Sequence, residues 1–375
     1  MKVFLRNTLF PLIILVSLVV IYLLAWPVAV DPKAWQAPAA PAYTGHYSVN
    51  QALSNYVALD MAGATGPEGV LADDRGVVYA TTDQGWIVRW LPGSDRAERW
   101  VKMPGRPLGL AQGEGGVLWV ADAFEGLFQV QADGTLKNTV SQVTDQDRST
   151  PILYANDVTL ANGKVYFTDS TQRFGARAFN STYKASLADI LEHGSTGRLL
   201  EFDPSTGMTR VILRGLSFAN GVAADPAGEF LLVNETAAYR VWRYELLGPH
   251  AGTAKVVIDN LPGFPDNITA GQQGRFWLGF ASPRLPIVDK LADKPFIRKM
   301  VERLPAFLRP GAKHYGHVLA ISGKGRVLAN LQDPDAAYPM TTGVFETNDY
   351  LYVSSLVAPH LARLDKTAVA EFIAP

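Results

Sequence analysis

The sequence predicts an all-β protein, a six-bladed β-propeller with an N-terminal transmembrane helix and helical insertions near the channel mouth. One pattern occurs six times along the chain, in which a junction residue leads into a short strand, a turn and a strand rich in Tyr, Trp, Leu and Val. In five copies a third strand follows. Repeats of about 40–50 residues built from four short strands are typical of propeller blades. A β-sandwich, or a pair of sandwiches, is the alternative fold.

Length and composition set the first limits on what the protein can be. The 375 residues are 48% hydrophobic and can bury a large core, and the length alone would also fit two domains. The 34 Lys and Arg residues nearly balance the 35 Asp and Glu residues, so no overall charge favours a nucleic-acid partner. The absence of cysteine excludes disulfides, thiolate nucleophiles and Cys-based zinc sites.

We expect three parts along the chain. Residues 1–30 are interpreted as a cytoplasmic stub and a transmembrane signal-anchor, and residues 31–54, which are rich in Pro and Ala, as an extended tether. Residues 55–375 are assigned to the propeller because the repeats override the two-domain alternative.

The N-terminal segment carries the membrane prediction. Residues 7–30 contain no charge, and Leu9–Leu24 is almost entirely apolar, which is enough for a helix to cross the ~30 Å hydrocarbon layer. Lys2 and Arg6 precede this run, so the positive-inside tendency places the rest of the chain on the non-cytoplasmic side, either periplasmic or extracellular. A cleaved signal peptide is the alternative, although Trp26–Val30 matches a cleavage site poorly.

The fourth repeat shows the pattern most clearly. A short strand over Val222–Ala224 enters the turn Asp225–Gly228, and the apolar strand Glu229–Val233 returns from it, which predicts a hairpin. Asn220 is separated from the first strand only by Gly221. A polar side chain gains nothing from burial at such a place unless something binds it.

The other repeats follow in order with similar turn spacing. The predicted hairpins pair residues 68–72 with 77–80, 108–111 with 117–120, 156–160 with 165–168, 222–224 with 229–233, 266–269 with 276–278, and 342–345 with 351–353. Third strands are predicted at residues 86–90, 127–130, 198–202, 239–244 and 361–364.

Two spacings exceed one blade and indicate insertions. Thr171–Thr196 is a polar loop with a possible short helix at Lys184–His193. Residues 282–310 alternate apolar residues with Lys and Arg at roughly helical spacing, which predicts a basic amphipathic helix. This helix could cover the propeller mouth as a lid or lie on a membrane surface, and a solvated cap helix without a function is the alternative.

The junction residues predict a metal site. In chain order they are Glu68, Leu108, Asn156, Asn220, Asp266 and Thr342. In a propeller these positions converge on one end of the channel, and two carboxylates with two amides are ligands that Ca²⁺ accepts, with open positions left for water or substrate. Asn267 adjoins Asp266 and could add a ligand. No His or Cys stands at a junction, which argues against zinc or copper. The alternative is that these polar residues only satisfy turns.

Several stretches resemble the strictosidine synthase-like and adipocyte plasma membrane-associated protein-like family of six-bladed propellers. The resemblance covers roughly residues 55–365 and is densest in YANDVTLANGKVYFTDSTQRF, LSFANGVAADPAGEFLLVNET and LPGFPDNI. More distantly, the chain is similar to paraoxonases, gluconolactonases and diisopropylfluorophosphatase. In that superfamily a Glu, two Asn and an Asp, often with a following Asn, hold a calcium at the channel mouth. This implies the ligands Glu68, Asn156, Asn220, Asp266 and Asn267.

Three departures narrow what the resemblance implies. Strictosidine synthase relies on a glutamate in the loop that enters the last blade, whereas Ala336–Thr342 contains no acid, so we do not expect the alkaloid-forming condensation. Paraoxonases have a catalytic histidine near the second return strand, and Trp119–Leu127 contains none. They also place an acid directly after the metal-binding Glu for a second calcium. Gly69 occupies that position here, so one ion is expected.

The function predicted from these observations is a calcium-dependent hydrolase of lactones or aryl esters. Asp266, or secondarily Glu68, is the predicted general base for an attacking water. His314 and His317 are alternatives, and no G-x-S-x-G motif indicates a serine nucleophile. The competing hypothesis is a non-catalytic, membrane-anchored propeller whose calcium is structural and whose mouth binds a partner or small ligand. The expected partners are a small ester or lactone and, through the N-terminal helix, a membrane.

Overall fold

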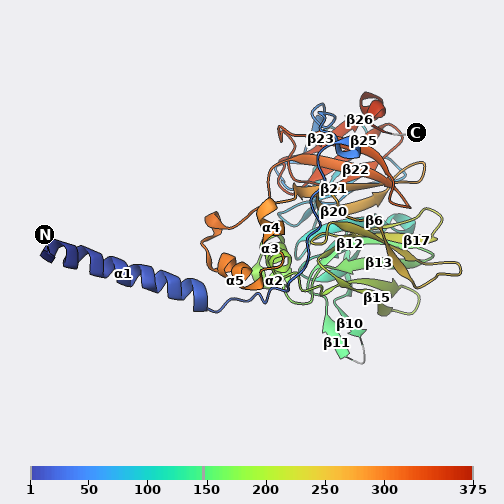
Figure 1. Ribbon diagram of the computed structural model, residues 1–375. Helices are drawn as coiled ribbons and strands as arrows, with labels where there is room; N and C mark the ends of the chain where they lie inside the picture. The colour runs from blue at the N-terminus through green and yellow to red at the C-terminus, as the bar shows by residue number, and fades with distance from the viewer. Residues whose placement is uncertain (1, 146–147, 374–375) are drawn as a thin grey trace.

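The structure is a computed structural model that describes residues 2–145 and 148–373. Six four-stranded antiparallel sheets make up its main body (Figure 1), which confirms the predicted six-bladed propeller. We number the blades 1 to 6 in chain order. Their strands are β2 (Val70–Ala72), β3 (Val78–Thr81), β4 (Trp86–Trp90) and β5 (Glu98–Lys102); β6 (Pro107–Gln112), β7 (Leu118–Asp122), β8 (Gly126–Val130) and β9 (Leu136–Val140); β12 (Ala155–Ala161), β13 (Lys164–Asp169), β14 (Gly197–Asp203) and β15 (Met208–Leu216); β16 (Ala219–Ala224), β17 (Phe230–Glu235), β18 (Arg240–Glu245) and β19 (Ala254–Ile258); β20 (Gly263–Ala270), β21 (Arg275–Pro283), β22 (Gly316–Ser322) and β23 (Val327–Asp333); and β24 (Thr341–Glu346), β25 (Tyr350–Ser355) and β26 (His360–Asp365) with β1 (Val57–Asp60).

The first strand of each blade lies innermost, and these strands form a closed ring. Strand β2 contacts β6, β6 contacts β12, and the contacts continue through β16, β20 and β24 back to β2. The last blade is completed by the N-terminal strand β1, which pairs with β26 so that Leu59 lies opposite Leu361. Pairing the two ends of the repeat array joins the ring by hydrogen bonds and buried apolar contact.

The hydrophobic core lies between neighbouring blades. Val, Leu, Ile and aromatic residues of adjacent sheets form shared clusters, as where Trp277 of blade 5 packs with Val344 and Leu351 of blade 6. Burial of both faces explains why the strands read as nearly continuous apolar runs.

Helices gather at one end of the ring, around the insertions (Figure 1). They are α2 (Ala176–Phe179), α3 (Thr182–Glu192), α4 (Pro286–Lys290), α5 (Pro295–Arg303) and the 3₁₀ turn η3 (Ala306–Leu308). The predicted helix at 184–193 is α3, and the Ser181 side chain caps its first turn. The helix expected in 282–310 is divided into α4 and α5 because Pro295 has no N–H to continue an α-helical ladder and instead starts a new helix.

Smaller elements complete the chain. A hairpin that the sequence did not predict, β10 (Gln142–Asp145) with β11 (Arg148–Pro151), projects from the body in Figure 1. The remaining 3₁₀ turns are η1 (Gly45–Tyr47), η2 (Glu114–Gly116) and η4 (Thr367–Phe372).

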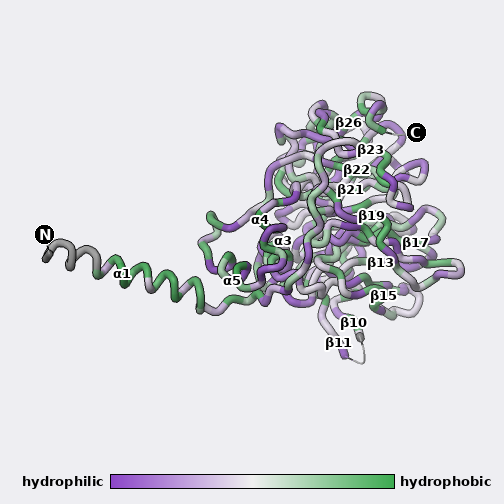
Figure 2. Tube along the Cα trace, viewed as in Figure 1, coloured by the Kyte–Doolittle hydropathy of each residue, from purple (hydrophilic) through white to green (hydrophobic). Residues whose placement is uncertain are grey.

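The N-terminal helix α1 (Lys2–Ala25) extends away from the propeller (Figure 1), and the part of it that is coloured in Figure 2 consists mostly of hydrophobic residues. Within residues 2–145 and 148–373, no helix combines the length and the apolarity required to cross a membrane. The transmembrane signal-anchor that we expected within residues 1–30 is therefore not supported.

The segment after α1 is extended and packs along the propeller instead of standing free. The Lys33 amide donates to the Glu192 carbonyl at 2.8 Å, and the Trp35 ring stacks on His193 with centroids 4.1 Å apart. Farther along, Asn260 Nδ2 donates to the Ala39 carbonyl at 2.8 Å. These contacts run along the end of the ring where the insertions lie.

Candidate metal centre

A β-bulge interrupts the innermost strand of blades 3, 4 and 5 at the predicted junction. Pairing with the second strand shifts register between Ala155 and Val158, between Ala219 and Val222, and between Pro265 and Ile268. A bulge adds an unpaired residue and changes the direction of its side chain. Asn156, Asn220 and Asp266 all lie within these bulges. Their side chains therefore do not follow the regular alternation of side chains between the two faces of the sheet.

Glycine after the junction allows the inner strands to approach closely. A Cβ on Gly221 would collide with the backbone of Asn267 and Ile268 in the next blade. A Cβ on Gly69 would likewise collide with the Leu108 carbonyl. Close approach of neighbouring inner strands keeps the end of the channel narrow, which brings the junction side chains within reach of one another.

The structure brings the predicted ligands together. Four of them, Glu68, Asn156, Asn220 and Asp266, are buried and line the same pocket. Asn220 Nδ2 donates to Asp266 Oδ1 at 2.7 Å. Asn267 is also buried but does not line the pocket, and its Nδ2 donates to the Glu68 carbonyl at 2.9 Å. Residues from blades 1, 3, 4 and 5 thus form one cluster at the channel end.

The carboxamide oxygens of this cluster have no hydrogen-bond donor. Among the described residues, Oδ1 of Asn156, Asn220 and Asn267 is buried and unpartnered, whereas each Nδ2 donates a hydrogen bond. An unsatisfied buried acceptor costs about 1–3 kcal/mol, so oxygens left free in this way indicate that another group binds them. A hard cation is the ligand that suits them.

The charges of the two carboxylates also favour a cation. Burial, together with the charges of Glu68 and Asp157, raises the pKa of Asp266 well above its usual range. Burial also raises the pKa of Glu68, against the lowering effect of Arg106. Asp266 therefore needs a proton or a positive ion, whereas Glu68 already shares the positive charge of Arg106. Among the described residues, no three His, Cys, Asp or Glu side chains are placed so that they could hold a metal ion by themselves. A set of two carboxylates and three amides suits Ca²⁺ better than zinc.

Arg106 is a site residue that the sequence reading missed. Its guanidinium lies 2.7 Å from Glu68 Oε2, and its Nη1 is buried without a hydrogen-bond acceptor. The Asp122 carboxylate holds the loop by accepting from the amides of Gly105 at 3.1 Å and Arg106 at 3.0 Å. The sequence did contain a signal for this loop, because the return strand ends in an aspartate both in blade 2, at Asp122, and in blade 3, at Asp169.

Two hydroxyl residues, also missed, orient the asparagines. Asn156 Nδ2 donates to Ser170 Oγ at 2.9 Å, and Asn220 Nδ2 donates to Thr236 Oγ1 at 3.1 Å. Ser170 and Thr236 each follow the end of a return strand, so comparison of the repeats would have paired them with the ligands. Their hydrogen bonds hold the amide nitrogens and leave the oxygens free.

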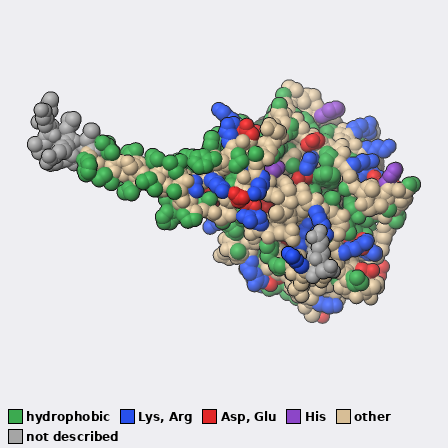
Figure 3. Space-filling view, turned by 60° about the horizontal axis from the view of Figure 1, so that its bottom comes forward, with side chains coloured by type: hydrophobic (Ala, Val, Ile, Leu, Met, Phe, Trp, Pro, Cys, Tyr) green, Lys and Arg blue, Asp and Glu red, His purple; other side chains and the backbone are tan. Residues whose placement is uncertain are grey.

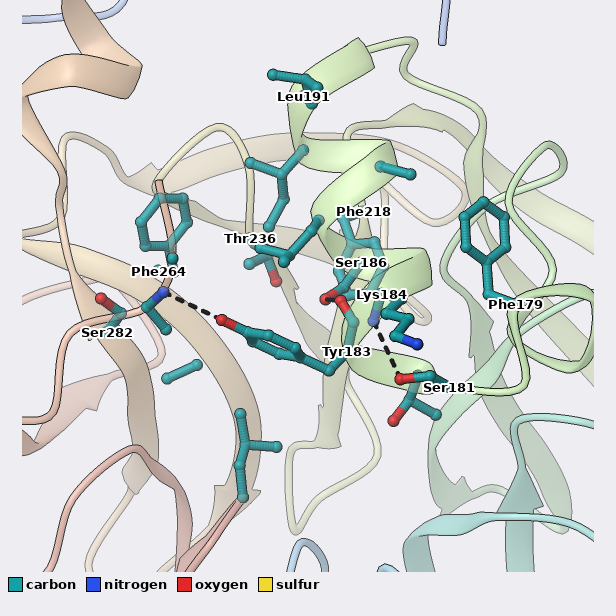
Figure 4. Close-up of a pocket in the computed structure, with 18 of the residues that line it drawn as sticks. Phe179, Ser181, Tyr183, Lys184, Ser186, Leu191, Phe218, Thr236, Phe264 and Ser282 are labelled. Carbon is teal, nitrogen blue, oxygen red and sulfur yellow. Dashed lines mark hydrogen bonds between the residues drawn. The ribbon is translucent and has the colours of Figure 1, made fainter. Parts of the chain in front are cut away.

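A cavity of about 1070 Å³ opens above the cluster. The upper wall of the cavity comes from α3 and from the insertion that holds α4 and α5. The cavity lining is largely apolar and includes the side chains of Phe179, Phe218 and Phe264 (Figure 4). Tyr183 extends across the cavity and accepts a hydrogen bond from the Ala312 amide at 3.1 Å. The two insertions therefore meet over the channel mouth.

The remaining candidates lie around the cluster. His314 lines the same cavity. His317 is buried on β22 outside the cavity lining, and burial lowers its pKa to about 3, so it is a poor base near neutral pH. Thr342 donates to the Glu68 carbonyl at 2.8 Å, and Leu108 accepts through its carbonyl from Thr81. Their junctions support the cluster without adding charge.

Comparison with known proteins finds relatives in the same family that the sequence motifs resemble. A sequence profile described as strictosidine synthase matches residues 155–249, and one described as strictosidine synthase-like, N-terminal, matches residues 45–90. The adipocyte plasma membrane-associated protein of Bos taurus is 32% identical over 91% of this chain and 85% of its own. Protein strictosidine synthase-like 13 of Arabidopsis thaliana is 35% identical over 72% of this chain and 69% of its own.

Solved structures resemble the fold at low sequence identity. A gluconolactonase from Xanthomonas campestris is 14% identical, with a TM-score of 0.60 over 89% of this chain and 98% of its own. A calcium-binding protein, regucalcin, from Agrobacterium tumefaciens is 16% identical, with a TM-score of 0.54 over 84% of this chain and 90% of its own. At such identities the likeness concerns the fold, while the closer sequence matches show that the chain belongs to the strictosidine synthase-like and adipocyte plasma membrane-associated protein family.

Proposed function

We propose that the protein is a calcium-dependent hydrolase that acts on lactones or aryl esters at the propeller mouth. The observation that carries this proposal is the set of unpartnered amide oxygens on Asn156, Asn220 and Asn267 beside two buried carboxylates, Glu68 and Asp266, under an apolar cavity. The gluconolactonase structure with the same fold is consistent with lactone chemistry.

These five residues would hold a single Ca²⁺, and Gly69 provides no acid for a second ion. When bound, the cation supplies Lewis-acid polarisation of a carbonyl oxygen and stabilises the charge that develops on it. Arg106, beside Glu68, adds a fixed positive charge at the same end of the cavity. The cavity wall would exclude water from the apolar part of a substrate.

Asp266 is the preferred general base. Glu68 shares Oε2 with Arg106, whereas among the described residues the Asp266 carboxylate accepts a hydrogen bond only from the neutral amide of Asn220. A carboxylate without a cationic side-chain partner accepts a proton from water more readily. In this assignment Asp266 takes a proton from water as the water oxygen attacks the carbonyl carbon. The acyl C–O bond then breaks, and the departing alkoxide takes that proton back from Asp266.

A hydrolase assay with calcium control tests the proposal. The full chain in mild detergent is offered a panel of lactones and phenyl acetate, with Ca²⁺, with chelator, and with Ca²⁺ restored. Turnover that disappears with chelator and returns with Ca²⁺ is the expected result. Absence of turnover on every substrate, while calcium binding persists, would contradict the hydrolase proposal.

That contrary result would favour the second candidate, a non-catalytic propeller with structural calcium. The ion pair between Arg106 and Glu68 supports this alternative, because a carboxylate held by a guanidinium is less available for chemistry. Binding of a partner or small ligand in the cavity would then be the function.

We also propose that the protein works at a membrane. The relatives named adipocyte plasma membrane-associated protein, and the apolar side chains exposed on α1, support this location. The earlier expectation that the propeller lies on the non-cytoplasmic side stays a prediction.

A further inference from the structure

Helix α5 has an inverted arrangement of polar and apolar side chains. Its two arginines within the helical turns are buried, with 3% of Arg298 and 8% of Arg303 exposed. Its aromatic residue faces outward, with 57% of Phe296 exposed, and Ile297 beside it is also exposed. A helix at a protein–water boundary normally does the reverse. Contact of the outer face with an apolar medium would remove these exposed side chains from water.

The apolar surface continues beyond α5. In η3, 84% of Phe307 is exposed, and Leu308 and, on α4, Ile287 are also exposed. Side chains of this size rarely gather on the surface of a monomer without a partner. We call this set, Ile287, Phe296, Ile297, Phe307 and Leu308, the mouth patch.

The buried arginines join the mouth patch to the end of α1. Arg303 donates to the carbonyls of Leu23 at 2.9 Å and Trp26 at 2.6 Å, and thereby binds carbonyls at the C-terminal end of α1. Arg298 donates to the carbonyls of Leu191, at 3.0 Å, and Lys33. The orientation of α5 is therefore fixed relative to α1, and α1 carries further exposed apolar side chains beside this segment (Figure 3).

We infer that the mouth patch inserts into the interface of a lipid bilayer that carries anionic headgroups. Apart from the buried Arg298 and Arg303, residues 286–309 contain four Lys or Arg and three Asp or Glu. Lys290, Lys294 and Arg309 are exposed among the apolar side chains, the last two in ion pairs with Asp293 and Glu302. Basic residues beside a bulky apolar face are typical of helices that lie in the headgroup region, with the apolar face about 5–10 Å deep. A second copy of the chain would not need this basic surround.

The inference rests on the proposed membrane location and adds the surface that makes contact. Val301 of α5 and Ile287 of α4 line the cavity, so the patch and the cavity wall belong to the same segment. Contact at the patch would place the cavity mouth against lipid. An ester or lactone with a long apolar chain could then enter without crossing water.

The cysteine-free sequence permits a direct test. Single substitutions Phe307→Cys and Phe296→Cys in the full chain are labelled with an environment-sensitive NBD fluorophore. Met208→Cys is the matched control, because Met208 is equally apolar and exposed but lies in β15, away from α5 in Figure 1. The labelled proteins are mixed with vesicles of phosphatidylcholine with or without phosphatidylserine, some containing spin-labelled lipid.

The expected result is a blue shift of the labels at 307 and 296, quenching by spin-labelled lipid, and a stronger effect with phosphatidylserine, while the label at 208 does not change. Labels that remain in water on vesicle-bound protein would overturn the inference and leave the membrane location intact. A blue shift without lipid quenching would indicate that a second copy of the chain covers the patch, and this result would also overturn the inference. Failure of the chain to float with vesicles would overturn both, and none of these outcomes depends on hydrolase activity.

Discussion

At the scale of single residues, the candidate centre depends on which end of each amide is satisfied. The nitrogens of Asn156, Asn220 and Asn267 all donate. A fourth buried amide, Asn234, donates to the Asp266 carbonyl at 2.7 Å, and its Oδ1 has no donor within the described part of the chain. Hydrogen bonding at the nitrogens orients the oxygens, so the surrounding hydroxyl and carbonyl groups define the site as much as the ligands do.

The first prediction concerns Asp266→Asn. This substitution keeps an oxygen ligand but removes the proposed base, so we expect turnover to fall by about 10²–10⁴-fold even when calcium is saturating. Glu68→Gln is the matched variant, because it also removes one carboxylate charge from the cluster. Its loss of activity should follow calcium affinity and recover with excess calcium. Steady-state rates against calcium concentration check both, and recovery of Asp266→Asn by calcium would rule out Asp266 as the base.

The second prediction concerns Asp189, a carboxylate buried on the inner face of α3. Burial raises its pKa from 3.8 to about 7, an effect that a hydrogen bond from Thr171 opposes. The folded state therefore binds this proton more tightly than the unfolded state does. The contribution of protonated Asp189 to the free energy of unfolding is fully present below about pH 4 and is lost as the pH rises through about 7. Asp189→Asn should accordingly stabilise the protein above pH 7, by at most about 4 kcal/mol, and have little effect near pH 4.

Thermal unfolding of Asp189→Asn and the parent chain between pH 4 and pH 9 measures this difference. Asp95→Asn, at an exposed aspartate, is the control and should follow the parent curve. Parallel curves for Asp189→Asn and the parent would show that Asp189 is charged in the folded state at neutral pH.

At the scale of secondary-structure elements, the sequence predicted contacts between neighbouring strands but not pairings between segments far apart in the chain. Turn signals such as Asp225–Gly228 and the apolar return strands located all six hairpins, because those contacts are short in sequence. Strand β1 was missed, because its partner β26 lies about 300 residues away and nothing local indicates the pairing. Arg106 was missed for the same reason, since Glu68 belongs to another blade.

The third prediction tests how β1 completes the ring. Leu59 is buried opposite Leu361, in a cluster that also contains Val78 of blade 1. Leu59→Ala should therefore cost about 2–5 kcal/mol, because it removes apolar contact and leaves a cavity where the first and last blades meet. The exposed Leu91→Ala is the control, with an expected change within about 0.5 kcal/mol.

Urea denaturation gives both midpoints and slopes for these variants. A lower midpoint with an unchanged slope is expected for Leu59→Ala if the ring unfolds cooperatively. A midpoint equal to that of Leu91→Ala would mean that β1 contributes little to the closed ring.

At the scale of the whole molecule, the insertions and the channel belong to one functional end. The predicted ligands lie at the base of the cavity, α3 and α5 form its upper wall, and α1 joins the same end through Arg303. The sequence indicated the insertions by their length, but not that 282–310 and 171–196 meet through Arg298 and the Leu191 carbonyl. Such contacts depend on three-dimensional placement, which the repeat pattern alone does not specify.

The last prediction follows from the number of blades that the candidate ion would bridge. Ligands from blades 1, 3, 4 and 5 would share one cation, so its binding should stabilise the ring as a unit and not one blade alone. Free calcium at 100 times Kd should add about 2.7 kcal/mol to the free energy of unfolding. Chelator should therefore lower Tm, and restored calcium should raise it again.

Asn220→Ala should lose this response, with calcium affinity reduced by at least ~100-fold, whereas Asn138→Ala, at an exposed asparagine of β9, should keep it. A calcium-dependent Tm that persists in Asn220→Ala would mean that the ion binds elsewhere. A Tm that ignores calcium in the parent chain would mean that the amide oxygens are satisfied by some other ligand.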